Sequence, residues 1–245
     1  MSHTLFISDL HLSEDRPDIT KAFEYFVANH INKQTDALYI LGDLFEYWIG
    51  DDDNSRFNQH IIDILNNISQ LTKVYFIHGN RDFAIGERFA KQANLTLLPE
   101  LKVIDLYGAN TLILHGDSLC TMDVEFMKFR KKSRKKWWQT MMLALPLFYR
   151  RHFANKSRER SKKAQLYKTE EIMDVTPFEV VNQMTLHDVN LMIHGHTHRP
   201  DIHRIGEAPD QSTRIVLGDW YEQGSYLVVD DKGFELKGFR LNPYK

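Results

Sequence analysis

Short apolar runs recur along the chain, and each of them ends in polar residues that can carry chemistry. The runs occupy residues 4–7, 37–41, 74–77, 111–114 and 191–193, and β-branched and aromatic side chains are common in them, as in buried strands. Elsewhere apolar positions recur every three or four residues, which predicts helices over residues 19–31 and 57–68, the first with Asp18 as its N-terminal cap. Strands that alternate with helices indicate an α/β fold built from βαβ units around a buried sheet.

The pattern changes after Ile205, where the predicted strands follow one another without helices. Residues 214–217, 225–229 and 234–239 are the candidate strands, and Asp231-Lys232-Gly233 is typical of a hairpin turn. The chain therefore ends in a strand-rich segment.

The polar ends of the apolar runs are evenly spaced, with one exception. Asp9, Asp43, Asn80 and His115 follow one another at intervals of 34, 37 and 35 residues, which suits one supersecondary unit each time. From His115 to His196 the interval is 81 residues, so this part of the chain holds more than one unit.

The extra length coincides with a strongly basic segment. Residues 128–168 contain 15 Lys and Arg residues and one acidic residue, Glu159, whereas the whole chain has a net charge of −2. The simplest interpretation is a helical cap at about residues 122–170, inserted into a single domain that spans residues 1–245. Such a block is ordinarily a solvated helix face, but it also attracts phosphates, on nucleic acid, an anionic membrane surface or a phosphorylated substrate.

Apolar residues are concentrated inside the basic segment. Residues 137–149 form the longest apolar stretch of the chain, which is 13 residues long and includes Gln139, Thr140 and Pro146. A spanning helix needs about 20 apolar residues. Basic residues that flank a dense apolar stretch are more typical of an interfacial, lipid-contacting element than of a nucleic-acid-binding arm. A helix of the cap that buries its apolar residues is the alternative, which the sequence leaves open.

The composition is that of a globular protein. Of the 245 residues, 42% are apolar and 26% are charged, which excludes a disordered or low-complexity chain. The single cysteine, Cys120, excludes an internal disulfide framework and thiolate zinc clusters. Asp9 and His11 stand too early for a signal peptide. We therefore expect a cytoplasmic protein without a transmembrane segment.

The polar residues at the run ends are of types that bind metal ions. They are Asp9, His11, Asp43, Asn80, His115, His196 and His198. Because open α/β sheets bind ligands beyond the carboxyl ends of their strands, these residues can meet although they are far apart in sequence. In an extended segment Asp9 and His11 point to the same side, as do His196 and His198, and Gly42 lets the backbone turn sharply before Asp43.

Seven such ligands suit two neighbouring metal sites that share a carboxylate. Oxygen and imidazole donors without thiolates favour Mn²⁺, Fe²⁺ or Zn²⁺ in a catalytic role over a structural zinc site. Two ions about 3.5–4 Å apart hold the attacking and the leaving oxygens in phosphoryl transfer, and a water between them becomes the nucleophile. The pattern therefore predicts a dinuclear phosphoesterase centre.

Five motifs resemble those of the calcineurin-like metallophosphoesterase superfamily. They are Asp9-Leu10-His11, Gly42-Asp43, Gly79-Asn80-Arg81-Asp82, His115-Gly116-Asp117 and Gly195-His196-Thr197-His198. The resemblance implies a metallophosphoesterase-type αββα sandwich, here with an inserted helical cap. Much of the superfamily has a His, its leaving-group acid, where this chain has Arg81.

Longer strings resemble one branch of the superfamily, which acts in lipid A biosynthesis, and this resemblance runs from about residue 4 to residue 240. The strings lie at residues 41–53, 78–83, 115–120, 144–148, 172–175 and 193–200. Enzymes of this branch hydrolyse the diphosphate of UDP-2,3-diacylglucosamine to UMP and 2,3-diacylglucosamine 1-phosphate. The resemblance implies that a metal-activated water attacks the phosphorus on the uridine side.

The resemblance also implies roles for individual residues. One Mn²⁺ would be held by Asp9, His11, Asp43 and His198, and the second by Asp43, Asn80, His115 and His196, with Asp43 as the bridge. The catalytic residues would be Asp43, Asn80, Arg81 and His115. The substrate would be contacted by Asn80, Arg81, Asp123, Ser161, Gln165, Lys168 and His196, with Gln165 standing where the branch has Asn.

Arg81 has a physical role that needs no proton transfer. Its guanidinium is always charged, grips phosphate oxygens with two parallel bonds and neutralises charge that grows on the diphosphate as the bond breaks. The alternative is a salt bridge to Asp82. Asp82 and Asp117 are also candidates to orient Arg81 or a ligand imidazole, and the acidic residues 51–53 are expected in a solvated loop near the site.

A substrate with two acyl chains and a nucleotide fits a cap that offers both apolar residues and cations. We therefore expect peripheral attachment to the anionic cytoplasmic side of the inner membrane, weakened by salt, with no nucleic acid and no obligate protein partner. One alternative is the same core acting on nucleic acid or soluble nucleotides, which a DNA competition assay would detect. Another is a non-catalytic binding module, which turnover of a diphosphate with Mn²⁺ would exclude.

Overall fold

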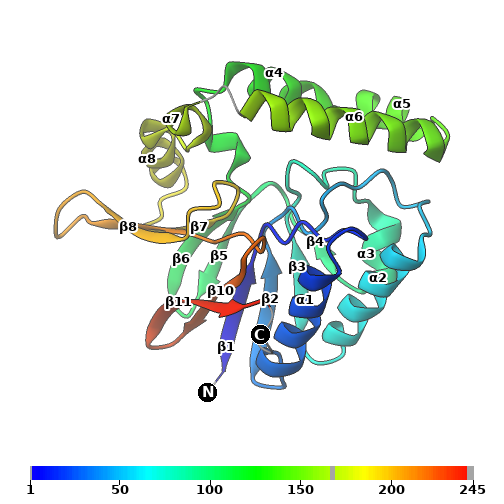
Figure 1. The fold of residues 1–245 in the computed structure, drawn as a ribbon. Coiled ribbons are helices and arrows are strands. Elements are labelled where there is room, and N and C mark those ends of the chain that lie inside the picture. The colour runs from blue at the N-terminus through cyan, green and yellow to red at the C-terminus, as the bar shows by residue number, and fades with distance from the viewer. Residues whose placement is uncertain (1, 166–168, 242–245) are drawn as a thin grey trace.

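The computed structural model describes residues 2–165 and 169–241, which form two mixed β-sheets with helices around them (Figure 1). One sheet has the strand order β11-β10-β1-β2-β3-β4 and the other has the order β5-β6-β7-β9-β8. The strands of the first sheet are β1 (His3–Ile7), β2 (Thr35–Ile40), β3 (Lys73–Phe76), β4 (Thr96–Leu97), β10 (Gln223–Asp230) and β11 (Gly233–Arg240). Those of the second are β5 (Leu101–Leu106), β6 (Ala109–Leu114), β7 (Leu191–His194), β8 (Asp201–Ile205) and β9 (Ser212–Val216).

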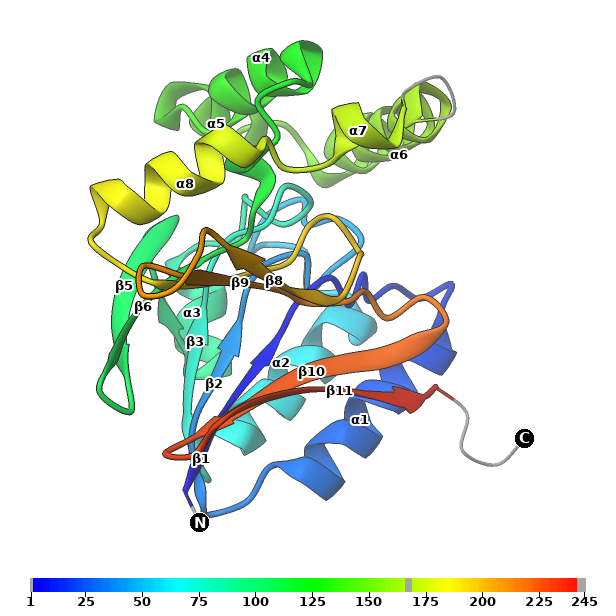
Figure 2. The same ribbon diagram turned by 90° about the vertical axis from the view of Figure 1, so that its left-hand side faces the viewer.

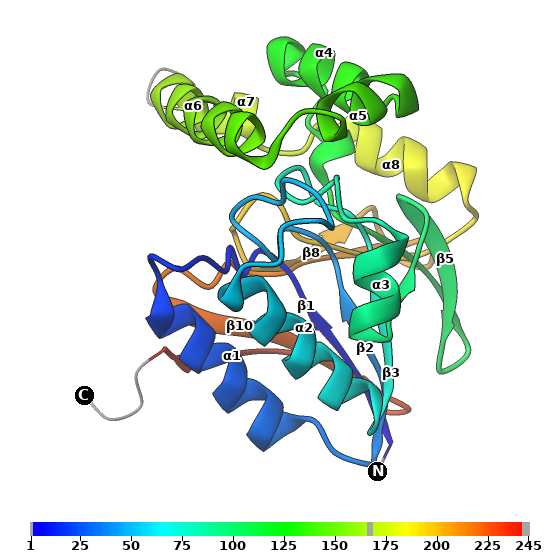
Figure 3. The same cartoon turned by 90° about the vertical axis from the view of Figure 1, so that its right-hand side faces the viewer.

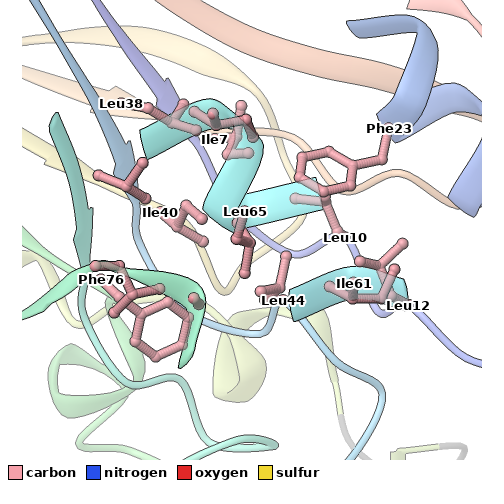
Figure 4. Close-up of a cluster of buried hydrophobic side chains, with 14 of the residues drawn as sticks. Ile7, Leu10, Leu12, Phe23, Leu38, Ile40, Leu44, Ile61, Leu65 and Phe76 are labelled. Carbon is pink, nitrogen blue, oxygen red and sulfur yellow. The ribbon is translucent and has the colours of Figure 1, made fainter. Parts of the chain in front are cut away.

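Strands β1 to β4 run parallel, and a helix connects each of them to the next. These helices are α1 (Pro17–His30), α2 (Arg56–Ser69) and α3 (Glu87–Ala93), which cover one face of the first sheet (Figure 3). Their apolar stripes pack on alternate residues of the strands, because successive side chains of a strand point to opposite faces. Figure 4 shows part of this core, in which Phe23 of α1 and Leu65 of α2 lie around Ile7 and Ile40.

The opposite face of the first sheet packs on the second sheet. Phe6 of β1 and Leu227 of β10 belong to an apolar cluster with Ile113 of β6 and Ile193 of β7. This layer holds the two sheets face to face, as the apolar inner faces of a sandwich do.

The outer face of the second sheet is covered by α8 (Pro177–Leu186), beside β5 and β6 in Figure 2. Val180 and Met184 of this helix pack on Leu112 and Met192 of the sheet. The layers thus follow one another as helix, sheet, sheet and helix, and the predicted αββα sandwich is confirmed.

Besides α8, the described chain has four α-helices between β6 and β7, and they lie beyond the carboxyl ends of the parallel strands (Figure 1). They are α4 (Val124–Ser133), α5 (Lys136–Leu143), α6 (Leu147–Gln165) and α7 (Glu170–Met173), and we call α4, α5 and α6 the cap. The division into a single domain over residues 1–245 with an insertion at about 122–170 stays a prediction.

The apolar pattern predicted the elements of the sheet centre but not all of those at its edges. Strands β5 and β8, which pair antiparallel at the edges of the second sheet, were not predicted, because both carry charged residues that interrupt the apolar run. The predicted cap of α1 was wrong: the N-cap residue is Arg16, Pro17 opens the helix, and Asp18 lies in its first turn.

Candidate metal centre

The seven predicted ligands all follow parallel strands, and they converge at one edge of the two sheets. Asp9 and His11 come after β1, Asp43 after β2 and Asn80 after β3, all from the first sheet. The second sheet supplies His115 after β6, and His196 and His198 after β7.

One cluster of donors consists of Asp9, His11 and His198. One ligand atom from each residue lies within 4.8 Å of the others. The Nε2 atom of His198 is 3.3 Å from Oδ1 of Asp9 and 3.2 Å from Nε2 of His11. An aspartate oxygen and two imidazole nitrogens thus face one common point.

The second cluster consists of Asp9, Asp43 and His115, whose ligand atoms also lie within 4.8 Å of one another. The Nε2 atom of His115 is 3.7 Å from Oδ1 of Asp43 and 3.0 Å from Oδ1 of Asn80. The ring of His196 lies 5.0 Å from the ring of His115, measured between centroids. Because Asp9 belongs to both clusters, the assignment of Asp43 as the bridge stays a prediction.

The chemistry of these donors fits divalent cations. Asp9, Asp43 and His115 are buried, and buried carboxylates need a compensating positive charge. The Oδ1 atom of Asp9 has no well-aligned hydrogen-bond donor among the residues that the structure describes, although its other oxygen has two. The residues therefore suit a pair of metal ions at this position.

The backbone is left-handed, not extended, at five of the seven ligands. The φ angles of Asp9, His11, Asp43, His196 and His198 lie between 51° and 71°. The expectation that Asp9 and His11 converge because extended side chains alternate was therefore wrong, although the two side chains do converge. Non-glycine residues in this region are strained, and such strain concentrates at functional sites.

Two glycines allow the ligand loops to approach each other closely. Gly42 has a φ angle of 86°, and a Cβ atom added to it would lie 2.6 Å from Cα of Gly79. The sharp turn that we predicted before Asp43 is confirmed, and it also makes room for the loop that carries Asn80.

Asp82 organises these loops through the backbone. It accepts hydrogen bonds from the backbone N–H groups of Gly79 and Leu44 at 2.9 and 2.7 Å, and it is fully buried. The alternative salt bridge from Arg81 to Asp82 is not observed; the guanidinium of Arg81 lies beside Glu46, with Nη1 3.3 Å from Oε1.

Asp117 holds the cap onto the core instead of orienting an imidazole. It accepts from Nε of Arg130 at 2.8 Å, and Nη2 of Arg134 lies 3.3 Å away. Arg130 belongs to α4 and Arg134 is its C-cap residue, and Nη2 of Arg134 also donates to the carbonyl of Gly79 at 3.0 Å. The cap and the loop before Asn80 are therefore in direct contact.

The electrostatics of the site are dominated by carboxylate–imidazole pairs. Burial alone would raise the pKa of Asp9, but the imidazole of His198, 3.3 Å away, lowers it strongly. Burial alone would lower the pKa of His115, but Asp43 and Asp9 raise it. The pKa of His196 is lowered well below its usual value by burial and by the charge of His115. His196 is therefore neutral, the form in which imidazole binds metals.

Two carboxylates at the site were not predicted. Glu46 lies 3.3 Å from Nδ1 of His11, and Asp219 lies 3.4 Å from Nδ1 of His198. Both occupy the position from which a carboxylate orients a ligand imidazole. Glu46 follows Asp43 within one of the longer motif strings, which was the available signal for it.

The predicted substrate contacts in the cap are only partly described. Asp123 is the N-cap residue of α4, where its side chain accepts from the N–H of Phe126 at 3.2 Å. Ser161 and Gln165 lie on α6, but their side chains are outside the described part of the structure. Lys168 is outside the described residues altogether.

The acidic residues 51–53 lie in a loop, but only Asp52 is well exposed, at 51% of its side chain. Asp51 accepts from the backbone N–H groups of Gly86 and Phe89, both at 3.0 Å, and Asp52 pairs with Arg150 of α6. The segment therefore joins α3 and the cap to the core.

The cap presents an apolar surface to solvent. The exposed fractions of Trp137 and Phe148 are 57% and 73%, and Tyr149 and Met141 are also half exposed or more, whereas Trp138 is buried. The alternative of a cap helix that buries these apolar residues therefore holds for Trp138 and in part for Met142 and Leu147, which are half-buried. Among the described residues, none of the helices is both long and apolar enough to cross a bilayer.

Comparison with known proteins gives one family and a set of full-length relatives. The sequence pattern described as "calcineurin-like phosphoesterase" matches residues 2–200. The UDP-2,3-diacylglucosamine hydrolase of Shewanella pealeana is 50% identical, over 95% of this chain and 96% of its own. Those of Photobacterium profundum and Coxiella burnetii are 50% and 48% identical, over 96% and 99% of this chain and 96% and 100% of their own.

Proposed function

The chain belongs to the calcineurin-like phosphoesterase family, and from this premise we propose that it hydrolyses the diphosphate of UDP-2,3-diacylglucosamine to UMP and 2,3-diacylglucosamine 1-phosphate. One observation carries the proposal: relatives that match 95% of the chain or more, at 48–50% identity, are named as hydrolases of this compound. The reaction would place the protein in lipid A biosynthesis.

The metals that we assign to the site are two Mn²⁺ ions. Asp9, His11, Asp43 and His198 would hold one, and Asp43, Asn80, His115 and His196 the other. The donor set contains oxygen and imidazole but no thiolate, which favours Mn²⁺ over structural zinc. Bound divalent cations would supply a nucleophile by lowering the pKa of water, and would neutralise charge on the phosphoryl oxygens.

Arg81 would bind the diphosphate and stabilise its developing charge. The side chain is 18% exposed, so it faces the site while remaining largely desolvated. Burial by itself would lower the pKa of Arg81, but the carboxylates of Asp43 and Glu46 raise it, and the guanidinium stays charged. A sugar phosphate is a good leaving group, so the absence of the usual His after Asn80 does not prevent cleavage.

The cap would bind the rest of the substrate. Phe126 of α4 stacks on the ring of His196, with centroids 5.8 Å apart, which places α4 over the metal ligands. Asp123, Ser161, Gln165 and Lys168 would contact the polar part of the substrate together with Asn80, Arg81 and His196.

The exposed apolar residues of the cap would attach the protein to a membrane. Lipid substrates and products move between the site and a bilayer, and basic residues beside an apolar helix face bind anionic leaflets. We assign this role to the stretch of residues 137–149 and its flanking basic residues, at the cytoplasmic side of the inner membrane.

The experiment that tests the reaction is hydrolysis of UDP-2,3-diacylglucosamine by the metal-free protein supplied with Mn²⁺, Mg²⁺ or Zn²⁺ in turn. UMP is expected, most rapidly with Mn²⁺, and in H₂¹⁸O the label is expected in UMP because the water attacks the uridine-side phosphorus. Label in the sugar phosphate would contradict that step. If UMP is released with none of the three metals, the proposed reaction is refuted.

Two controls separate the substrate from the chemistry. UDP-N-acetylglucosamine, which lacks the O-linked acyl chain, should be a poor substrate, and equal rates on both compounds would contradict the substrate assignment. The Asp43→Ala variant should lose turnover on all substrates, whereas Asp63→Asn, an exposed carboxylate on α2, should match the wild type.

A further inference from the structure

Glu46 is a buried carboxylate that joins four parts of the molecule. Its side chain is 3% exposed, and it lies in the loop after β2, three residues beyond Asp43. Neither the ligand motifs nor the expected substrate contacts include it. A buried carboxylate is costly unless its oxygens are fully paired, so the identity of its partners indicates what it does.

Each oxygen of Glu46 lies close to two nitrogen or hydroxyl groups, although Nδ1 of His11 and Nε of Arg158 are not aligned for hydrogen bonds. On Oε2 these are Nδ1 of His11 and the hydroxyl of Tyr221, both at 3.3 Å. On Oε1 they are Nη1 of Arg81 at 3.3 Å and Nε of Arg158 at 2.6 Å. The four partners are a metal ligand, the residue that would bind the diphosphate, an aromatic residue and a residue of the cap helix α6.

The contact with His11 fixes the face of the imidazole that is offered to a metal. With Nδ1 directed at Glu46, the other nitrogen, Nε2, lies 3.2 Å from Nε2 of His198. A carboxylate behind a ligand histidine sets its tautomer and raises its basicity. Tyr221 supports this orientation, because its ring stacks on that of His11 with centroids 5.0 Å apart and an interplanar angle of 4°.

The contact with Arg81 fixes the guanidinium in the same manner. The backbone N–H of Arg81 donates to Oδ1 of Asp43 at 2.8 Å, so its main chain is tied to one ligand. Glu46 ties its side chain to another ligand, His11. Because Arg81 is held both at its main chain and at its side chain, it loses little conformational freedom when it binds a diphosphate.

The contact with Arg158 connects this arrangement to the cap. Arg158 is 28% exposed on α6, and it forms an ion pair with Glu46 in which Nε lies 2.6 Å from Oε1. Burial alone would raise the pKa of Glu46, but His11, Arg81 and Arg158 lower it to about 2, so the carboxylate is charged whenever the protein is folded near neutral pH.

We propose that Glu46 is a positioning residue, which holds His11 toward a metal and Arg81 toward the diphosphate, and which ties both to the cap through Arg158. The inference rests on the proposed function for the roles of His11 and Arg81. It adds a residue that touches neither metal nor substrate.

The test compares Glu46→Gln, Arg158→Met and the double variant with the wild type. Glu46→Gln is expected to lower both the affinity for Mn²⁺, measured by calorimetry on the metal-free protein, and kcat, each by roughly 10- to 100-fold, as for other carboxylates behind a ligand histidine. Arg158→Met is expected to leave Mn²⁺ affinity unchanged and to raise KM severalfold, because the cap is held less firmly. Glu46 and Arg158 would hold the cap through the one contact between them, and Arg158→Met already removes it. The KM of the double variant should therefore equal the KM of Arg158→Met alone.

Matched controls remove the same groups elsewhere. Glu24→Gln takes away an exposed carboxylate that pairs with His60, and Arg88→Met takes away an exposed guanidinium bonded to Asn54. Both should match the wild type in Mn²⁺ affinity, kcat and KM. If Glu46→Gln does not fold, Glu46→Asp retains the charge and is expected to lower Mn²⁺ affinity and kcat, because the shorter side chain cannot reach all four partners.

Wild-type Mn²⁺ affinity and kcat in the Glu46 variants would overturn the positioning role. An unchanged KM in Arg158→Met, or effects on KM that multiply in the double variant, would overturn the link to the cap. Failure of the wild type to hydrolyse the lipid substrate would refute the proposed function alone, because the calorimetric comparison with Mn²⁺ would still decide the role of Glu46 at His11.

Discussion

The backbone N–H of His196 donates a 2.8 Å hydrogen bond to Oδ2 of Asp9, although 187 positions separate the two residues. Asp9 follows β1 of the first sheet and His196 follows β7 of the second, so this bond closes the sandwich at the metal centre. The hydroxyl of Ser8 donates to the same oxygen at 2.6 Å. One oxygen of Asp9 is thus fixed by the protein, and the other is left for a metal.

Gly42→Ala should destabilise the protein and abolish hydrolysis. The added Cβ would meet Cα of Gly79 at 2.6 Å, so the loops of Asp43 and Asn80 would have to separate, at a cost of about 1–3 kcal/mol in the free energy of unfolding. Urea denaturation and the turnover assay measure the two effects. Gly108→Ala is the matched control: its φ angle of 91° is equally unfavourable for alanine, but no atom lies within 4 Å of the added Cβ. It should lose about 1 kcal/mol and no activity; equal activity losses in both variants would contradict the steric argument.

Asp82→Asn should weaken the ligand loops without removing a ligand. The carboxylate accepts from the N–H groups of Gly79 and Leu44, and an amide in its place turns one acceptor into a donor that faces a backbone N–H. We expect a loss of about 1–3 kcal/mol in the free energy of unfolding, since a buried backbone N–H is left without an acceptor. Urea denaturation of the metal-free protein measures it. Asp63→Asn, on an exposed position, should have no effect, and a wild-type midpoint for Asp82→Asn would show that its bonds are dispensable.

Local pattern and motif spacing account for the site's location but not for its geometry. The apolar runs locate the strands, and the residues after them are the ligands, because parallel strands present their carboxyl ends at one edge. The left-handed backbone at Asp9 and His11 was not predictable from the pattern. Non-glycine residues adopt it only when the surrounding structure requires it, and here that structure comes from the opposite sheet.

Residues that act through tertiary contacts were likewise beyond the reach of the sequence. Glu46 contacts Arg81 and Tyr221, which are 35 and 175 positions away, and no spacing rule connects such residues. A salt bridge from Arg81 to Asp82 was the alternative that the sequence left open. In the folded chain Asp82 turns to backbone N–H groups, which a buried carboxylate can satisfy more completely than one side chain can.

Mn²⁺ should raise the thermal stability of the protein, and EDTA should reverse the effect. Metal bound only to the folded chain stabilises it by about 2.7 kcal/mol at a concentration one hundred times the dissociation constant. Differential scanning calorimetry of the metal-free protein with and without Mn²⁺ measures the shift in Tm. The increase in Tm that Mn²⁺ causes should be smaller in His115→Ala than in the wild type. It should be the same as in the wild type in His30→Ala, which changes a histidine on α1. An identical shift in His115→Ala would show that the stabilising ion binds elsewhere.

Cys120 should be unreactive in the folded protein. The thiol is 2% exposed, and burial together with the charges of Asp117 and Asp174 raises its pKa to about 12, so almost no thiolate is present at neutral pH. Ellman's reagent should label it only after guanidinium is added. Met122→Cys in a Cys120→Ser background places a thiol at a residue that is 48% exposed and should react at once. Rapid labelling of native Cys120 would mean that the segment after β6 opens readily.

Removing the exposed aromatic residues of the cap should detach the protein from anionic membranes and leave its chemistry intact. Trp137 and Phe148 are 57% and 73% exposed, and burying one such side chain contributes about 1.5–3 kcal/mol, so Trp137→Ser with Phe148→Ser should lower vesicle affinity by at least about 100-fold. Sedimentation with phosphatidylglycerol vesicles measures this binding, which should also fall as salt is added, because the basic residues attract the anionic surface.

Phe178→Ser is the control, because it removes an equally exposed aromatic residue outside the stretch of residues 137–149. Phe178 lies on α8 and is 77% exposed, and the variant should bind vesicles as the wild type does. Turnover of detergent-dispersed substrate should be unchanged in all three proteins. Equal binding of the double variant and Phe178→Ser would place the membrane contact on another surface.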